Sequence, residues 1–448
     1  MDAVAAWHEL LQDGNELSPQ FTSGLARSMR ERKLTFGDRI HCPFLRPFFL
    51  TEQDEARVRL AAETVASLGE LVTRAALESQ AVFDQLGLSD AEARLVRMDP
   101  GYDRASTAAR LDAFLLPDSI HFAEYNAESP AGPAYTQRLA ELFDSLPVMA
   151  RFRAGRRVRF TPTIEPLLEA LIASYREWGG TAEPPTIAIV DWRNVPTWTE
   201  FEILGEAFVE LGVPALVCDP RDLSFDRGVL TAGGRRIDLV YRRVLMNDIV
   251  ARTDDCAALL KAYESRAVCV ANTFRCKLAH KKAFFAVLTD ERNASLFSDR
   301  ERATIAAHVP WTRVVGDVKT VWKGRASGLL KLAEDERENL VLKPNDEYGG
   351  TGVKLGWEMP PSDWSAALGV AVAAPDGSWV LQERIPVRRE VFPQFDAAGA
   401  VTMRDMLVDF APYLFRGRMS GYLTRLSATG LANVTSGGGQ VPSFVIGH

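Results

Sequence analysis

The chain has 448 residues, of which 47% are apolar and 25% are charged, a composition typical of globular proteins. Its 59 acidic and 52 basic residues give a formal net charge of −7, which argues against a general binder of nucleic acid or of membrane surfaces. The length predicts roughly two to three folding units.

Cysteine usage and the apolar pattern predict a cytoplasmic protein. The five cysteines are scattered and include no Cys-x-x-Cys pair, so neither a disulfide framework nor a zinc site is supported. The N-terminus lacks a basic segment followed by an apolar core, which predicts no signal peptide. No apolar run reaches the length of about 18 residues that would predict a membrane span.

Taken in chain order, residues 1–90 are expected to be mainly helical, with Thr51 capping a helix over 52–79. Segments 93–102 and 121–130 are expected to be neighbouring strands. From 160 to 270, apolar strands alternate with helices and predict a small, partly parallel sheet.

The final third has many expected strands, some of them long, and predicts a mixed α+β region. Its strongest local signal is a run of glycines between two strands, in LVLKPNDEYGGTGVKLGW. Lys343 ends the first strand, and Gly349, Gly350, Thr351 and Gly352 follow. Backbone amides without side chains can fold over phosphate oxygens, and Lys343 can supply a positive charge. The alternative is a glycine-rich turn after a surface lysine.

Two further segments fit a nucleotide site. A strand that ends in Gln382, Glu383 and Ile385 could offer polar groups to an adenine or a ribose, or could be a solvated edge strand. Lys281 and Lys282 precede an apolar helix, where cations oppose the helix dipole. The two lysines therefore need an anionic partner nearby, unless their side chains are simply solvated.

Glu124 and Asn126 alternate along the expected strand 121–130, where Asn is a poor strand former. Two oxygen-bearing side chains on one strand face would be wasted in a core but useful around a cation. Asp99 and Arg97 lie on the strand expected before it, although Asp99 could be a turn residue before a proline and Arg97 a partner in a salt bridge.

Together these segments resemble the ATP-grasp superfamily, whose glutathione synthetases carry a helix lysine, a strand lysine, a glycine loop, a hinge strand and a closing Glu-x-Asn. Here "VRMDP" and "FAEYNAESP" precede the glycine loop. That order resembles the circularly permuted ATP-grasp proteins typified by glutathionylspermidine synthase.

The resemblance implies an α+β fold, a circularly permuted ATP-grasp fold with a small α/β pre-ATP-grasp-like domain and a helical N-terminal region. The expected divisions are a helical region 1–94, a metal-ligand segment 95–155, a substrate-side α/β domain 156–270 and the nucleotide-binding subdomains 271–448.

The resemblance also implies a Mg²⁺- and ATP-dependent ligase that joins a small-molecule carboxylate to an amine through an acyl phosphate. A phosphotransferase and a non-catalytic ATP-binding protein are the alternatives. The oligomeric state and both substrates stay open, and Gly437–Gly439 could form a second lid or only a loop.

The implied site residues fall into four groups: metal ligands Asp99, Glu124 and Asn126; catalytic Arg97 and Arg425; ATP-binding Lys282, Lys343, Gly349, Gly350, Thr351, Gly352, Gln382, Glu383 and Ile385; substrate-binding Ser129 and Arg243.

Overall fold

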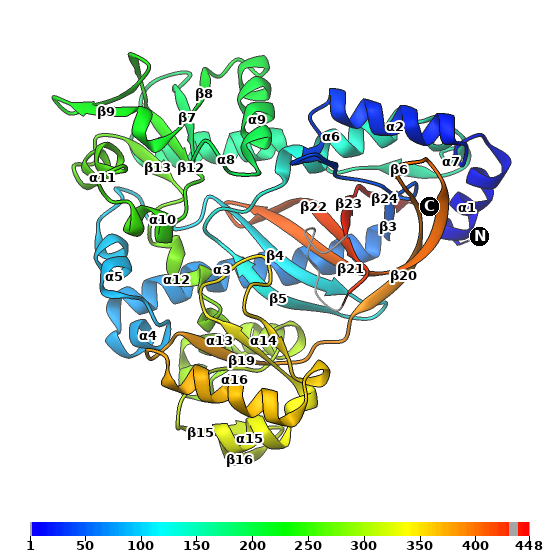
Figure 1. The fold of residues 1–448 in the computed structure, drawn as a ribbon. Helices are drawn as coiled ribbons and strands as arrows, with labels where there is room; N and C mark the ends of the chain where they lie inside the picture. The colour runs from blue at the N-terminus through cyan, green and yellow to red at the C-terminus, as the bar shows by residue number, and fades with distance from the viewer. Residues whose placement is uncertain (1, 430–437, 448) are drawn as a thin grey trace.

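The centre of the protein is an antiparallel sheet built from two distant parts of the chain (Figure 1). The computed structural model describes residues 2–429 and 438–447. The strand order is β23-β22-β21-β4-β5, and β20 pairs with the other half of β21. The strands are β4 (Ala108–Leu115), β5 (Ile120–Asn126), β20 (Arg388–Phe395), β21 (Val401–Phe415), β22 (Arg418–Ser427) and β23 (Gly439–Val441). The early hairpin β4–β5 thus lies in one sheet with the last strands of the chain.

A long helix, α3 (Glu52–Glu78), packs against this sheet (Figure 1). It begins at Thr51, whose side chain accepts a hydrogen bond from the Asp54 amide, while the Asp54 carboxylate accepts one from the Thr51 amide. The side chains of Val58, Val65 and Val72 are fully buried at helical spacing. The predicted helix and its cap are confirmed.

The other helices of the N-terminal region are α1 (Ala3–Asp13), α2 (Pro19–Glu31), α4 (Gln80–Gln85) and α5 (Asp90–Arg97). The strand predicted over 93–102 is wrong, because most of that segment lies in or directly after α5. Ser89 and Glu92 form a reciprocal capping box at the start of α5, and this local signal outweighs the apolar run that follows. Between α2 and α3 lie three short strands, β1 (Thr35–Phe36), β2 (Arg39–Ile40) and β3 (Phe48–Thr51).

The segment from 160 to 270 contains the predicted α/β sheet, and all four of its strands are parallel, in the order β13-β12-β7-β8. The strands are β7 (Ile187–Val190), β8 (Ala215–Cys218), β12 (Leu239–Arg242) and β13 (Cys269–Ala271). The associated helices are α8 (Ile164–Glu177), α9 (Trp198–Glu210), α10 (Met246–Ala251) and α11 (Ala257–Glu264). A small meander completes it, with β9 (Leu223–Asp226), β10 (Val229–Ala232) and β11 (Arg235–Arg236), and its turn at Gly233-Gly234 is the predicted one.

A third sheet, in the order β14-β19-β17-β18, forms the lower part of Figure 1. Its strands are β14 (Thr312–Val314), β17 (Leu340–Pro344), β18 (Lys354–Leu355) and β19 (Trp379–Glu383). Its neighbours are α12 (Cys276–His280), α13 (Ala283–Thr289), α14 (Asp299–His308), α15 (Leu329–Asp335), α16 (Pro361–Ala373), β15 (Lys319–Trp322) and β16 (Arg325–Gly328). Leu342, Trp364 and Leu381 belong to an apolar cluster separate from the main core, so this unit packs around a core of its own.

Four further helices and strands lie between or after these sheets in the chain, and one of them, β24, pairs the C-terminal segment with earlier strands. They are α6 (Pro133–Asp144), α7 (Pro147–Phe152), β6 (Arg157–Arg159) and β24 (Ser443–Gly447). β24 pairs in parallel with β3 and antiparallel with β6, so the last strand is held between early ones. Within the described residues, every helix is too short or too polar to cross a membrane.

Candidate active site

The hairpin β4–β5 presents an oxygen-rich face because β5 contains a bulge. Asp112 pairs with Glu124, but Ala113 pairs with Phe122, which leaves Ala123 as an extra residue in β5. The bulge reverses the alternation of the strand. Phe122 and Tyr125 are both buried, whereas Glu124 and Asn126 remain partly exposed on the cavity side. Asp112 and Glu124 lie directly opposite each other, so their side chains share one face of the sheet.

Two arginines surround the Asp112 carboxylate. Arg110 Nε donates to Asp112 Oδ1 at 2.8 Å, and Arg425 on β22 donates to Asp112 Oδ2 at 2.6 Å. Arg425 also pairs with Asp409 on β21. Burial opposes ionisation of Asp112, but the two arginines outweigh it, so the pKa of Asp112 lies well below its ordinary value. Burial and the neighbouring Asp112 raise the pKa of Asp409 to about 7, although Arg425 and Arg110 act against this shift.

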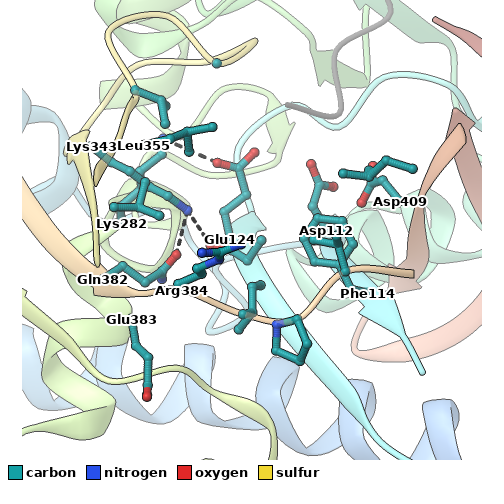
Figure 2. A pocket seen from close by; sticks show the side chains of 18 of the residues that line it. Asp112, Phe114, Glu124, Lys282, Lys343, Leu355, Gln382, Glu383, Arg384 and Asp409 are labelled. Carbon is teal, nitrogen blue, oxygen red and sulfur yellow. Dashed lines mark hydrogen bonds and ion pairs between the residues drawn. The ribbon is translucent and has the colours of Figure 1, made fainter. Parts of the chain in front are cut away.

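Lys343, at the end of β17, faces this group of charges (Figure 2). Its Nζ donates to Gln382 Oε1 at 2.5 Å and to the Ala123 carbonyl at 3.3 Å, so the bulge residue itself contacts the lysine. Burial lowers the pKa of Lys343 to about 8, and only the nearby Glu124 and Asp112 carboxylates offset this effect. An anionic ligand beside Lys343 would stabilise the charged ammonium and so offset the effect of burial on its pKa.

Lys282 connects the glycine loop to the oxygen-rich face. Its Nζ lies 3.4 Å from Glu124 Oε2 and donates to the Glu347 carbonyl, at the start of the loop. Asn126 Nδ2 donates to Glu124 Oε1 at 3.2 Å. Gly349 has a φ of 65°, in the left-handed region that glycine tolerates.

Two adjoining cavities lie on either side of Glu124. The first, which we call the hinge cavity, has a volume of about 260 Å³. Its polar lining includes Asp112, Glu124, Lys282, Lys343, Glu347, Gly349, Gly350, Gln382, Glu383, Arg384, Arg389, Asp409 and Arg425, and its apolar wall includes Val341, Leu355, Ile385 and Leu407. A cavity with one apolar wall and one charged wall can take a flat base at one end and phosphates at the other.

The second cavity, which we call the chamber, has a volume of about 520 Å³ and shares Glu124, Gly349 and Arg425 with the hinge cavity. The rest of its lining includes Phe36, His41, Arg110, Asn126, Ser129, Tyr135, Leu245, His280, Thr351 and Gln440. The predicted Thr351 therefore lines the chamber and not the hinge cavity. Gly352 lines neither cavity and has a φ of 73°. Of the predicted glycine segment 437–439, residue 437 lies outside the described residues, and Gly439 begins β23.

Two predicted residues lie elsewhere, and their placement corrects the sequence-based site. Arg97 ends helix α5, where its guanidinium stacks on Phe83 and donates to Gln80. Asp99 pairs with Arg266 at 3.1 Å and accepts from the Gly101 amide. Neither side chain lines either cavity. The reason is that Arg97 ends helix α5 and Asp99 follows shortly after it, so neither residue lies on a strand beside β5. The Arg-x-Asp sequence that faces Glu124 is Arg110-Leu111-Asp112.

The position of Arg110 and Asp112 had a signal in the sequence. In "AARLDAFL" an Arg-x-Asp pair interrupts an otherwise apolar strand, shortly before the Glu124 segment. Burial of charges in a strand is costly unless they are paired or bind a ligand, so this pattern is itself informative.

Arg243, predicted to bind substrate, lies outside the lining of both cavities. Only 4% of the residue is exposed, and its guanidinium donates to the carbonyls of Pro130 and Ser129 and to the Tyr241 hydroxyl. Ser129, in contrast, lines the chamber, and its hydroxyl donates to the Arg243 carbonyl at 2.7 Å. Arg243 therefore holds the chain segment that shapes the chamber wall.

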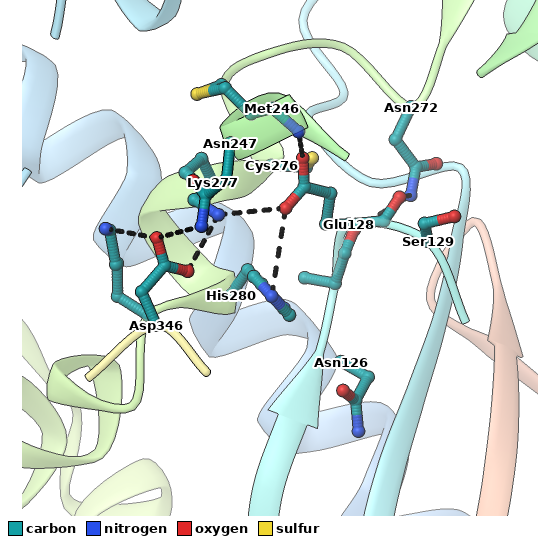
Figure 3. Close-up of polar contacts among 12 residues, drawn as sticks. Asn126, Glu128, Ser129, Met246, Asn247, Asn272, Cys276, Lys277, His280 and Asp346 are labelled. Atoms are coloured by element: carbon teal, nitrogen blue, oxygen red, sulfur yellow. Dashed lines mark hydrogen bonds and ion pairs between the residues drawn. The ribbon is translucent and has the colours of Figure 1, made fainter. Parts of the chain in front are cut away.

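A buried ionic network links the chamber wall to the glycine loop (Figure 3). Lys277 on α12 lies 3.0 Å from Glu128 and 2.7 Å from Asp346, the residue that leads into the loop. Arg242 donates to Glu128 at 3.0 Å. Burial opposes ionisation of Glu128, but Lys277 and Arg242 lower its pKa to about 2. Sequence reasoning missed this network because its members come from four separate segments.

The donor chemistry of the site fits Mg²⁺ and ATP. Asp112, Glu124 and Asn126 offer only oxygen ligands on one face, the type that Mg²⁺ prefers. Lys343 is desolvated and Lys282 adjoins it, so two cations lie where phosphate charge would be neutralised. Among the described residues, no group of three or more His, Cys, Asp or Glu side chains could hold a metal ion, so this oxygen set depends on the Asn126 amide beside the two carboxylates.

Comparisons with known proteins add two findings, although no protein-family model matches the chain. A curated protein of Frankia casuarinae, which carries the provisional name glutamate–cysteine ligase 2-2, is 26% identical over 339 residues. The match covers 72% of this chain and 36% of that protein, so the chain spans little more than a third of its relative's length.

Among solved structures, a glutathione synthetase-like effector (GSS30) of Globodera pallida, in its apo form, superposes with a TM-score of 0.59. The match covers 96% of this chain and 98% of that chain at 12% identity. A structure from Methylobacillus flagellatus, provisionally named as a γ-glutamylcysteine synthetase, superposes with a TM-score of only 0.40. The match has 10% identity and covers 84% of this chain and 86% of that chain. The chain therefore has a mixed α+β fold like that of a glutathione synthetase-like protein, and it is similar in sequence to part of a protein provisionally named as a ligase.

Proposed function

We propose that the protein is a Mg²⁺- and ATP-dependent carboxylate–amine ligase of the ATP-grasp type. The observation that carries this proposal is the face formed by Asp112, Glu124 and Asn126, opposite the partly buried cations Lys343 and Lys282. The similarity to a protein named as a ligase and the glutathione synthetase-like fold support the same reaction class.

In the proposed reaction, a substrate carboxylate oxygen attacks the γ-phosphorus of ATP and releases ADP. The amine nitrogen then attacks the carbonyl carbon of the acyl phosphate, the carbon–oxygen bond to phosphate breaks, and the nitrogen loses a proton. Phosphoryl transfer of this kind needs positioning and charge neutralisation rather than a covalent protein group. Bound Mg²⁺ would neutralise the phosphate oxygens and fix their orientation.

Each group of residues has a task that follows from its place. Lys343 and Lys282 bind phosphate oxygens, and Gln382, Glu383 and Ile385 border the base and ribose. Asp112, Glu124 and Asn126 hold the metal. Arg425 lines both cavities, and Arg110 lines the chamber beside it. Both stabilise the transferred phosphoryl group, for which a fixed guanidinium is well suited.

We also propose that the ATP-grasp order of this chain is circularly permuted. In support, the carboxylate hairpin β4–β5 pairs with β21, although the strands of the hinge cavity, β17 and β19, come between them in the chain. The chamber, bordered by Ser129 and Leu245, would take the carboxylate and amine substrates.

The test is ADP release from Mg–ATP in the presence of pooled amino acids, small peptides and polyamines, with mass spectrometry of the products. A ligase gives pool-dependent ADP and a product lighter by one water than its summed reactants, and Glu124→Gln abolishes both. A phosphorylated product formed without an amine would instead indicate a phosphotransferase. ATP binding without turnover in any pool would indicate a non-catalytic protein.

A further inference from the structure

The chamber has a second group of polar side chains that the ligase chemistry does not use. His41 follows β2 and Tyr135 lies in the first turn of α6, and both line the chamber without lining the hinge cavity. Their rings lie 4.1 Å apart, centroid to centroid. Phe36 and Gln440 lie on the same wall of the chamber. The pair therefore belongs to the substrate cavity but not to the phosphate end.

Both side chains are buried and have polar atoms left over. His41 is 6% exposed, and neither of its ring nitrogens hydrogen-bonds to any described residue. Tyr135 is 3% exposed, and no described residue meets the geometry of a hydrogen bond with its hydroxyl, although the Glu200 backbone and the Thr199 side chain lie close enough to lower its pKa. Buried polar groups are normally paired, because an unpaired one costs free energy. The two side chains that carry these three atoms line one cavity, so a ligand in the chamber is the partner nearest to them.

The two side chains are uncharged. Burial lowers the pKa of His41 to about 4, against a small opposing effect of the Thr35 backbone, so the imidazole is neutral near pH 7. Burial and the adjacent Glu200 carboxylate raise the pKa of Tyr135, so the phenol keeps its proton. A neutral imidazole and a phenol offer one hydrogen-bond donor and one acceptor each.

The charges around the chamber narrow the choice of ligand. Among the described residues, Glu124 is the only carboxylate in the chamber lining, and it already contacts Lys282. Arg110 and Arg425 also line the chamber, and the carboxylates that pair with them, Asp112 and Asp409, lie outside its lining. A molecule with several ammonium groups would find few counter-ions and two arginines. A ligand carboxylate placed near Tyr135 would find only uncharged side chains there, and the nearby Glu200 carboxylate would repel it.

We propose that the chamber holds a substrate whose end away from the reacting group is an uncharged hydrogen-bonding group, a carboxamide or a hydroxyl, bound by His41 and Tyr135. This inference rests on the proposed ligase function, because the reacting end is placed at Arg110, Glu124 and Asn126. It assigns the substrate to small, neutral-ended molecules and excludes polyamines.

The first test measures binding directly. The chain has six histidines, so histidine-selective ¹⁵N labelling gives a small set of NMR signals, and His41→Phe assigns the one that matters. Three pools are added in turn, with and without Mg–ATP. They are a neutral one (glutamine, asparagine, serine, threonine), an acidic one (glutamate, aspartate) and a cationic one (lysine, ornithine, spermidine). We expect the neutral pool to shift the His41 signal. A larger shift with either charged pool, or no shift with any pool, overturns the proposal.

The second test measures turnover with the component that supports ADP release. We expect His41→Phe and Tyr135→Phe each to raise its KM by about tenfold, the loss typical of one hydrogen bond, with little change in kcat. His41→Gln, which keeps a donor and an acceptor, should recover part of the loss. His8→Phe is the matched control, because its Nε2 is also buried without a partner among the described residues but lines neither cavity.

The two proposals fail in distinguishable ways. ADP release that depends on a charged-ended substrate, or that His41→Phe leaves unchanged, refutes the inference and leaves the ligase function standing. A His41 shift with the neutral pool, but no ADP with any pool, supports the binding site and counts against the ligase function.

Discussion

At the scale of single residues, the site depends on charges that are neutralised only in part. Asp112 is fully paired with Arg110 and Arg425. Glu124, in contrast, meets Lys282 at a longer distance, and the partly buried Lys343 has only uncharged hydrogen-bond partners. Such an arrangement is poised to receive an anionic ligand together with a cation, because each unmatched group gains a partner when both bind.

Asp112→Asn should lower ADP formation by about 100-fold or more, because it removes a negatively charged oxygen at the proposed metal face. Steady-state rates at saturating Mg–ATP measure this effect. Asp99→Asn is the matched control and should leave the rate unchanged, since Asp99 pairs with Arg266 outside both cavities. Equal losses in the two variants would contradict our placement of the site.

ATP affinity should fall as pH rises above about 8. In the free protein, burial lowers the pKa of Lys343 to about 8, and bound phosphates would raise it, so binding takes up a proton when the pH exceeds that value. The dissociation constant should increase by up to about tenfold per pH unit in this range. Titration calorimetry between pH 7 and about 10 gives the profile. Lys343→Arg, which stays charged, should flatten it, and a flat wild-type profile would refute the assignment.

At the scale of elements, two irregular pieces of backbone build the site. The bulge at Ala123 turns Glu124 and Asn126 away from the side on which Phe122 is buried, and the glycine loop after β17 uses left-handed residues. A regular strand and a regular hairpin would place neither group against Lys343, because strict alternation would send Glu124 to the same side as Phe122.

The glycines of the loop should differ in how well they tolerate a side chain. An alanine Cβ at Gly349 meets open space, so Gly349→Ala incurs mainly the left-handed backbone strain of about 1 kcal/mol. At Gly352 the Cβ would also lie 2.7 Å from Pro344, next to Lys343. We expect Gly352→Ala to weaken binding of a non-hydrolysable ATP analogue more than Gly349→Ala does, as measured by calorimetry. The reverse order would mean that the loop has another shape.

At the scale of the whole molecule, a single buried lysine joins parts of the protein that are far apart in sequence. Lys277 contacts Glu128, which precedes Ser129 of the chamber lining, and Asp346, which leads into the glycine loop (Figure 3). Arg242, at the end of β12 in the parallel sheet, also pairs with Glu128. The central sheet, the parallel α/β sheet and the third sheet (β14-β19-β17-β18) therefore meet at one ionic network beside the site.

Lys277→Met should destabilise the protein by about 3–5 kcal/mol, because it leaves buried carboxylates with one cation fewer. Chemical denaturation followed by circular dichroism measures the change. The double variant Lys277→Met/Glu128→Gln should regain part of the loss, since it removes one of the uncompensated charges. Lys33→Met is the control and should cost under about 1 kcal/mol, because the Lys33 pair with Glu202 and Glu206 is exposed. A Lys277 effect as small as that of Lys33 would contradict the proposed coupling.

Much of the local structure could be predicted from the sequence. The helix after Thr51, the parallel sheet between 160 and 270, the turn at Gly233-Gly234 and the strands around the glycine loop all follow from patterns within about ten to thirty residues. The same holds for Lys343, Lys282, Glu124 and Gln382, which meet at the hinge cavity. Each of these side chains sits at the end of a strand or helix whose apolar face is evident locally.

What only the tertiary structure decided was which charged residues complete the site. "VRMDP" and "ARLDAF" both contain Arg-x-Asp, and this motif alone does not show which of the two lies opposite Glu124. A capping box turns the first into the end of a helix, and pairing with β5 and β21 places the second in the sheet. The physical reason is that helix caps and amphipathic faces are set by neighbours in the chain. Strand partners, buried ion pairs and unpaired polar atoms such as those of His41 depend on segments hundreds of residues away.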